Sequence, residues 1–178
     1  MQSIVSLLDE RHREIVRCLW AELDSKFIQQ GFCPIPYPHI SFHVAEGYDA
    51  AHVRQALART ASASKPLRVL TSGLGIFTGL AHPVIYLTVV RDSALTELHA
   101  RVWEEVQGAY SEGNAHYEPS RWIPHITLAQ GEVLKERLPD IIQLLWQRDF
   151  TWEIVIESLS LIYDDGERQG VEMSFDLT

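Results

Sequence analysis

Two short stretches of the chain carry the residue types that proton-transfer chemistry needs. They are Tyr37–Phe42 and Ile123–Leu128, which start 86 residues apart. In each, an aromatic or apolar residue precedes Pro-His-Ile, and a hydroxyl residue and an apolar residue follow. In a β-strand such a stretch places the imidazole and the hydroxyl on one face and apolar side chains on the other. An imidazole that titrates near neutral pH, beside a hydroxyl that donates a hydrogen bond, suits phosphate chemistry. The four residues concerned are His39, Ser41, His125 and Thr127.

The same spacing extends beyond these stretches, which indicates an internal duplication. Two similar halves, roughly residues 1–90 and 91–178 of a single domain, would bring the two stretches together about a pseudo-twofold axis. We therefore predict one central cleft in which two histidines and two hydroxyls face each other. The further segments that match at an offset of 86 are Arg68–Ser72 with Ile154–Ser158 and Ile76–Phe77 with Ile162–Tyr163.

Hydrophobic periodicity and turn residues predict an α+β fold with two lobes, each an antiparallel sheet with helices outside. Asp9, Asp49 and Asp92 are suited to begin helices. Ile15, Leu19, Leu23 and Phe27 recur at helical spacing and predict the buried face of the first helix, which Gly31 would end. We expect helices at 9–30, 51–61, 92–110 and 133–147. We expect strands at 3–8, 39–45, 66–77, 83–90, 125–129, 151–163 and 171–177, with a loop at 111–124.

Composition excludes several classes of protein. The 178 residues carry a formal net charge of −9, which argues against a protein that coats nucleic acid, because such binding depends on Lys and Arg. We expect a monomer whose partner is a small nucleotide or an RNA-end phosphate ester. No stretch reaches the length of ~20 apolar residues that spans a membrane, and the N-terminus does not resemble a signal peptide, so we expect a cytoplasmic protein. Cys18 and Cys33 have no metal-ligand spacing, and we expect Cys18 to be a packed thiol.

His43 follows Ser41 by two residues, so strict alternation places it on the same face as His39. There it would contact the substrate or tune His39, or remain a partly exposed strand residue. A metal site built from His39, His43 and His125 is conceivable, but no carboxylate stands at a helpful spacing, and we expect neither a metal nor a cofactor. The pattern His39-x-Ser41-x-His43 lacks the central nucleophilic histidine of histidine-triad hydrolases, which rules out that family.

Several aromatic and basic residues near the two stretches are candidates for substrate binding. Tyr37 and Trp122 precede the two histidines, and Phe77 and Tyr163 hold matching positions 86 residues apart. Each could stack on a nucleobase or serve only in packing. Arg121 and His116 lie before the second histidine and could reach a phosphate or remain solvated.

The two His-x-Ser/Thr-apolar motifs, the duplication and the leading strand and helix resemble the two-histidine phosphoesterase superfamily, in particular its 2′-5′ RNA ligase-like, or cyclic phosphodiesterase, branch. The resemblance covers nearly the whole chain, with Ser41 in place of a commoner Thr. It implies a bilobal α+β fold and metal-independent cleavage of 2′,3′-cyclic or 2′,5′-linked phosphates. By this resemblance His39 and His125 are catalytic, and Ser41 and Thr127 hold the phosphate. The pseudo-symmetry leaves open which histidine is the base.

The sequence thus favours a phosphodiesterase in which the two histidines share the acid and base roles. The alternative is a non-catalytic module that binds a nucleotide or phosphate on the same fold. Paired titratable groups favour the enzyme, because binding alone does not need them. Nothing in the sequence indicates RNA ligation.

Overall fold

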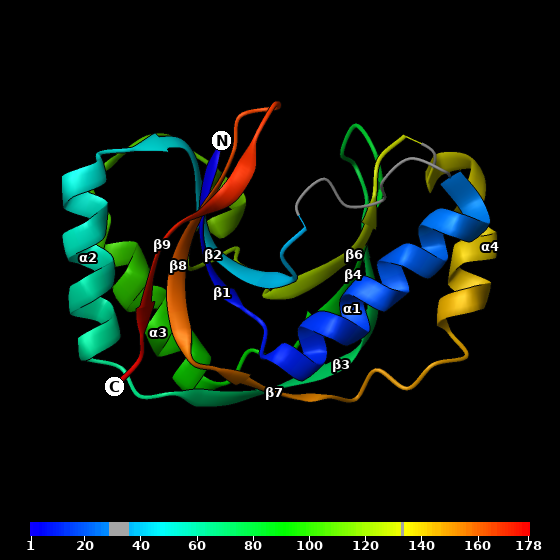
Figure 1. The fold of residues 1–178 in the computed structure, drawn as a ribbon, viewed down its shortest axis with the longest axis horizontal. Helices are drawn as coiled ribbons and strands as arrows, with labels where there is room; N and C mark the ends of the chain where they lie inside the picture. The colour runs from blue at the N-terminus through cyan, green and yellow to red at the C-terminus, as the bar shows by residue number, and fades with distance from the viewer. Residues whose placement is uncertain (29–35, 133) are drawn as a thin grey trace.

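Two antiparallel sheets form the body of the computed structural model, which describes residues 1–28, 36–132 and 134–178. The strand order is β5-β2-β1-β8-β9 in the five-stranded sheet and β6-β4-β3-β7 in the four-stranded sheet. The predicted bilobal α+β fold is confirmed (Figure 1). The strands are β1 Gln2–Leu7, β2 His39–Tyr48, β3 Leu67–Phe77, β4 Val84–Val89, β5 Tyr110–Gly113, β6 His125–Gln130, β7 Glu153–Ile156, β8 Ser158–Asp164 and β9 Gln169–Asp176.

Helices cover the outer faces of both sheets. In Figure 1, α2 and α3 lie against the five-stranded sheet, and α1 and α4 lie beside the four-stranded sheet. The predicted caps Asp9, Asp49 and Asp92 are confirmed, since each side chain accepts a hydrogen bond from the backbone N–H three residues later. The helices are α1 Glu10–Leu23, continued by a π-helical turn Asp24–Ile28, then α2 Ala50–Ser62, α3 Ser93–Glu105, a 3₁₀ turn Ala115–Tyr117, and α4 Leu134–Leu145.

The two halves of the sequence are interleaved in space. Each sheet takes strands from both halves, and the chain crosses from one sheet to the other at Glu157, which separates β7 from β8. The single strand predicted at 151–163 is therefore two strands. The ladder between β3 and β7 runs from Leu67 opposite Ile156 to Leu70 opposite Glu153. Leu67 and Glu153 are equivalent at the offset of 86, as are Leu70 and Ile156, so the pseudo-twofold axis passes through this ladder.

Both strands that carry the predicted motifs contain a β-bulge at the same relative position. Against β1, Phe42 is left unpaired between Ser41 and His43. Against β4, Leu128 is left unpaired between Thr127 and Ala129. A bulge adds one residue and so reverses which face the following side chains occupy. His39 and Ser41 therefore share a face with Val44, and not with His43.

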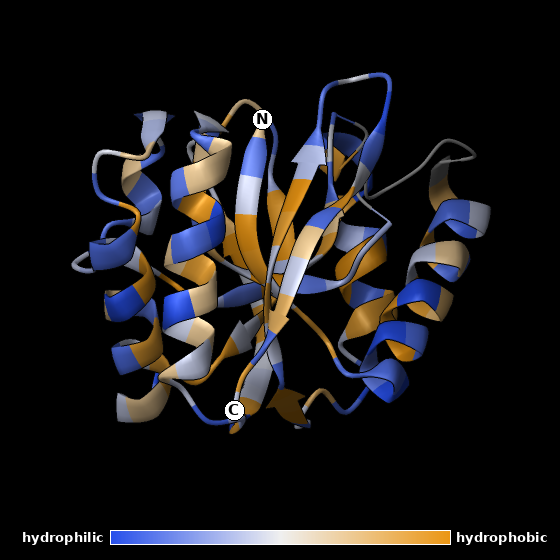
Figure 2. Cartoon of the chain, turned by 60° about the vertical axis from the view of Figure 1, so that its left-hand side comes forward, coloured by the Kyte–Doolittle hydropathy of each residue, from blue (hydrophilic) through white to orange (hydrophobic). Residues whose placement is uncertain are grey.

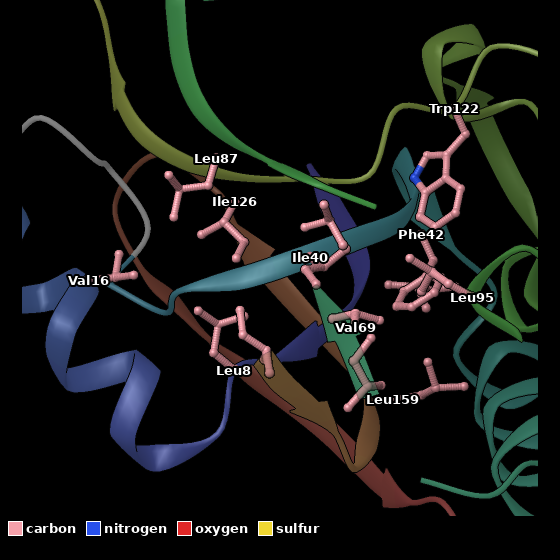
Figure 3. Close-up of a cluster of buried hydrophobic side chains, with 14 of the residues drawn as sticks. Leu8, Val16, Ile40, Phe42, Val69, Leu87, Leu95, Trp122, Ile126 and Leu159 are labelled. Carbon is pink, nitrogen blue, oxygen red and sulfur yellow. The ribbon is translucent and has the colours of Figure 1, made fainter. Parts of the chain in front are cut away.

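The apolar faces of both motif strands meet a common core. Ile40 and Ile126, which are equivalent at the offset of 86, are fully buried in one cluster with Leu87 and Val69 (Figure 3). Hydrophobic residues concentrate on the sides of helices and strands that face this interior, as the orange segments of Figure 2 show. Burying the backs of both motif strands in one core holds the two strands in fixed relation.

The first helix buries most of the predicted face, because Leu19 and Leu23 are buried and Phe27 packs against the core, but Val16 takes the place of Ile15. Val16, Leu19 and Leu23 are buried together with His12, whereas Ile15 is 37% exposed. His12 can be buried because its Nδ1 lies 2.8 Å from the carboxylate of Asp9. The prediction that the Cys18 thiol is packed in the core is wrong, because that thiol is exposed.

The predicted loop at 111–124 contains regular structure. Helix α3 ends at Glu105 instead of reaching Tyr110, which begins β5 on the edge of the five-stranded sheet. Gly113 permits this edge, because a Cβ there would lie 2.5 Å from the ring of Tyr110. The predicted helix end at Gly31 and the thiol of Cys33 lie outside the described residues. No helix within the described ranges is long and apolar enough to cross a membrane.

Candidate active site

A cleft of about 350 Å³ opens between the two sheets, and both motifs line it. His39 and Ser41 reach it from β2 of one sheet, and His125 and Thr127 reach it from β6 of the other. Its volume is within the range usual for sites that bind small molecules. The structure thus brings together the four residues that the duplication predicted to share one cleft.

Each cleft histidine is anchored by the carbonyl two residues before it. The Nδ1 of His39 lies 2.5 Å from the carbonyl oxygen of Tyr37, and the Nδ1 of His125 lies 2.7 Å from that of Ile123. A carbonyl oxygen only accepts hydrogen bonds, so Nδ1 is the protonated nitrogen of both neutral rings. This leaves Nε2 of each ring, with its lone pair, as the nitrogen available to a molecule in the cleft.

Burial favours the neutral form of both imidazoles. Desolvation, together with the charge on a protonated His125, lowers the pKa of His39 to about 4 despite the opposing effect of the Tyr37 carbonyl. Desolvation also lowers the pKa of His125. A phosphate that entered the cleft would favour protonation of one ring, because a nearby negative charge raises the pKa of an imidazole.

An indole N–H supports each bulge beside a cleft hydroxyl. Nε1 of Trp122 donates to the carbonyl oxygen of Ser41 at 2.8 Å, and Nε1 of Trp20 donates to that of Thr127 at 3.3 Å. Trp122 borders the cleft but is only 2% exposed, and its ring stacks on His99 with centroids 3.9 Å apart. For Trp122 the sequence left both stacking on a nucleobase and packing open, and its observed contacts position the backbone of β2.

His43 points away from the cleft, which corrects the expectation from strict alternation. The bulge at Phe42 turns it toward α3, where it is 1% exposed. Its Nδ1 lies 2.5 Å from Oη of Tyr48, and the rings of Trp103 and Tyr110 pack against it. His43 therefore has no direct access to a molecule in the cleft.

The remaining predicted substrate-binding residues divide into two groups. Phe77 and Arg121 line the cleft, as does His116. Tyr37 and Tyr163 are not among the described residues that line it. The ring of Tyr163 lies instead against Gly170 of β9, and Tyr37 contributes its carbonyl oxygen to His39.

Sequence reasoning missed several residues of the cleft, among them Val44, Gln130, Asn114 and Tyr117. Val44 and Gln130 are 86 residues apart and follow the two bulges, so the duplication would have identified them had the bulges been recognised. Burial raises the pKa of the Tyr117 phenol, while a hydrogen bond with Ser41 opposes that shift. Tyr117 and Ser41 both line the cleft.

The cleft contains little fixed charge. Arg121 is the one lining side chain with a permanent charge in the part of the chain that the structure describes. Across residues 1–28, 36–132 and 134–178, no three His, Cys, Asp or Glu side chains gather as metal ligands would. The arrangement is two neutral imidazoles and several hydroxyl donors, which can transfer protons and stabilise negative charge on oxygen.

Comparisons with known proteins agree with this geometry. The model of the 2′-5′ RNA ligase superfamily matches residues 10–168. No curated protein gives a significant match. The fold is similar to that of TT0787 of Thermus thermophilus, at a TM-score of 0.66 and 16% identity over 99% of this chain and 97% of that one. It is also similar to E. coli LigT complexed with 3′-AMP, at a TM-score of 0.62, 16% identity and the same coverage of both chains. LigT complexed with ATP gives a TM-score of 0.62 at 14% identity over 99% of this chain and 96% of that one.

The family match spans most of the chain and includes both histidine motifs. The solved structures share the fold over nearly their whole lengths. The chain belongs to the 2′-5′ RNA ligase superfamily of two-histidine phosphoesterases.

Proposed function

We propose that this protein is a metal-independent phosphodiesterase that hydrolyses a 2′,3′-cyclic or 2′,5′-linked phosphate of a nucleotide or an RNA end. The observation that carries the proposal is the matched anchoring of His39 and His125. Each ring donates Nδ1–H to a main-chain carbonyl, and each leaves Nε2 to the same cleft. Two imidazoles fixed in this manner can act as base and acid in one displacement at phosphorus.

The hydroxyls supply the remaining chemistry. Ser41 and Thr127 lie on the same strand faces as the histidines and would donate hydrogen bonds to the non-bridging phosphate oxygens, where charge builds in the transition state. One permanent cationic side chain among the described lining residues suits a singly charged diester. The likeness to a protein crystallised with 3′-AMP and with ATP supports a nucleotide as the ligand.

The test is hydrolysis of nucleoside 2′,3′-cyclic phosphates and 2′,5′-linked dinucleotides in the presence of EDTA. Wild-type turnover should survive EDTA, and His39→Ala and His125→Ala should each reduce kcat by roughly 10²-fold or more. His52→Ala, on α2 away from the cleft, is the matched control and should retain wild-type activity.

Two results would contradict the proposal. Loss of activity in EDTA would show that a metal takes part. Nucleotide binding without turnover of any of these substrates would favour the non-catalytic binding module instead.

A further inference from the structure

Trp122 connects the segment ahead of the second motif to the strand that carries the first. It lies three residues before His125, and its Nε1–H donates to the Ser41 carbonyl oxygen at 2.8 Å in a buried hydrogen bond. In Figure 3 the indole nitrogen lies against the ribbon of β2, beside Phe42. Phe42 is the bulge residue left unpaired against β1, so the ladder does not fix the strand at this point. The orientation of the indole therefore controls how the Ser41 backbone is held beside the cleft.

His99 of α3 fixes the orientation of this indole. Its imidazole stacks on the Trp122 ring, with centroids 3.9 Å apart and ring planes inclined by 14°. Its Nε2 lies 3.0 Å from the carbonyl oxygen of Tyr117, a residue that lines the cleft. A carbonyl oxygen only accepts hydrogen bonds, so Nε2 carries the proton of the neutral ring. One imidazole thus holds both the indole and the main chain of the loop that precedes it.

An imidazole is costly to bury at this position. His99 is fully buried, and desolvation, together with the charge of Arg91, lowers its pKa to about 4 despite the opposing hydrogen bond with the Tyr117 carbonyl. A fourth apolar side chain would fill the space without burying a polar group. An aliphatic residue would lack both the flat face that meets the indole and the donor that meets Tyr117. The other buried residues of this helix are Leu95, Leu98 and Val102.

Arg91, two residues after β4, holds the same segment from the surface. Its Nη1 donates to the Trp122 carbonyl oxygen at 3.0 Å, and its Nη2 donates to that of Pro119 at 2.7 Å. The guanidinium carbon lies 5.7 Å from the centroid of the Trp122 ring, within the range of a cation–π contact. Trp122 is thus fixed at its ring by His99 and at its main chain by Arg91.

We infer that His99 and Arg91 are positioning residues of this active site, which act through Trp122 on the geometry of Ser41. Neither is among the described residues that line the cleft. Ser41 would donate to a phosphate oxygen where negative charge builds, so a shift of its backbone weakens the transition state more than the bound substrate. The inference rests on the proposed function and predicts a loss of kcat with little change in KM.

Truncation of His99 tests the inference on a nucleoside 2′,3′-cyclic phosphate. His99→Ala should lower kcat by about 10²-fold, the cost of a small misplacement in an active site, and should change KM by less than about 3-fold. His99→Phe keeps a flat ring on the indole, so its kcat should stay within about 10-fold of wild type.

Leu98→Ala is the matched control for His99→Ala, because it truncates a neighbouring buried side chain of α3 that has neither a ring nor a donor. Its folded form should retain the wild-type kcat. Equal losses of kcat in His99→Ala and Leu98→Ala, or in His99→Ala and His99→Phe, would overturn the role of His99.

Arg91→Met gives a second test that leaves the core intact, since Arg91 is exposed. It should lower kcat by about 10-fold with little change in KM, because His99 still holds the indole. Arg101→Met is the matched control, since Arg101 donates to the carbonyl oxygen of Ala63 and neither residue lines the cleft in the described part of the chain. An unchanged kcat in Arg91→Met, or an equal loss in Arg101→Met, would overturn the role of Arg91.

A double-mutant cycle determines whether His99 acts through Trp122. Trp122→Phe removes the indole N–H that holds the Ser41 carbonyl. If His99 acts by orienting that N–H, adding His99→Ala to Trp122→Phe should lower kcat by less than about 3-fold further. Losses of kcat that multiply as independent effects would overturn the inference.

Hydrogen exchange of the indole N–H gives a readout that does not need turnover. The chain has five Trp, and the Trp122 signal is the one that Trp122→Phe removes from the proton–nitrogen correlation spectrum. This N–H should exchange about 10-fold or more faster in His99→Ala than in Leu98→Ala, and it should stay protected in His99→Phe. Equal exchange in His99→Ala and Leu98→Ala would overturn the inference. A wild-type protein with a protected indole and no turnover of cyclic phosphates would instead defeat the proposed function.

Discussion

Acid should destabilise this protein through two buried histidines that lie behind the cleft. His43 and His99 are 1% and 0% exposed, and desolvation lowers the pKa of each from 6.5 to about 4. Within the described part of the chain, one ring nitrogen of each has no hydrogen-bond partner, namely Nε2 of His43 and Nδ1 of His99. The folded-state pKa lies below the unfolded-state value, so between pH 6.5 and 4 the unfolded chain binds more protons. Their contribution to stability is complete above pH 6.5 and is lost as the pH falls toward 4.

The magnitude follows from the two pKa values. A histidine that titrates at 6.5 when unfolded and near 4 when folded reduces the free energy of unfolding by about 2 kcal/mol between pH 7 and pH 5. The two residues together should account for about 4 kcal/mol, a large part of the stability of an ordinary domain. Urea unfolding at pH 7, 6 and 5 measures this loss together with that from the cleft histidines His39 and His125, whose pKa values are also lowered.

His99→Gln isolates one of the two contributions. The Nε2 of His99 lies 3.0 Å from the carbonyl oxygen of Tyr117, and a Gln amide can keep a donor there without titrating. Between pH 7 and pH 5 the free energy of unfolding of the variant should fall by about 2 kcal/mol less than that of wild type, whatever its value at pH 7. His52→Gln on α2 should keep the wild-type pH dependence. If His99→Gln also showed the wild-type pH dependence of stability, the argument that His99 is buried in its neutral form would be refuted.

Two further pairs of variants test the architecture of the cleft, and both are measured by urea unfolding and by kcat/KM. Trp122→Phe should lower the free energy of unfolding by about 1–3 kcal/mol, because it leaves a buried bulge carbonyl without its donor. Trp20→Phe should lower the free energy of unfolding by less than Trp122→Phe does, since the hydrogen bond of Trp20 is longer and its ring is only half-buried. A loss equal to or greater than that of Trp122→Phe would contradict this reasoning. Gly75→Ala would place a Cβ 2.3 Å from the ring of Tyr86, and we expect a loss of about 1–3 kcal/mol together with reduced activity. At Gly47 an added Cβ would have its nearest neighbour at 3.8 Å, so the free energy of unfolding of Gly47→Ala should stay within about 0.5 kcal/mol of wild type. If both alanine variants lost the same stability, a steric cause at Gly75 would be excluded.

The sequence was sufficient to predict the cleft because the duplication reports on tertiary structure. A repeat with a fixed offset requires equivalent positions in space, so two matching histidine motifs imply a shared site. The bulges at Phe42 and Leu128 could not be predicted, because an unpaired residue depends on the register with a neighbouring strand. This one irregularity explains the inclusion of His43 and the omission of Val44 and Gln130. Asn114 and Tyr117 were missed for another reason, since they reach the cleft from the segment after β5.

Errors in the elements arose where pairing with another residue decides the structure. The apolar pattern of α1 favoured Ile15, but the contact between the Asp9 carboxylate and His12 lets a polar residue join the buried face. Strand β5 is short and exposed, and only its pairing with β2, which is distant in the sequence, makes it a strand. Propensity treats residues one at a time, so it registers neither the local pair nor the distant one.

The symmetric ladder between β3 and β7 has the geometry of an isologous contact between two subunits, in which each partner offers the same segment to the other. Here both segments belong to one chain, so the contact forms at a fixed effective concentration and does not depend on how much protein is present. The two cleft histidines lie on opposite sheets, which the chain links at Glu157 directly after this ladder, and they consequently stay aligned in a single molecule. The specific activity per chain should therefore be unaffected by dilution.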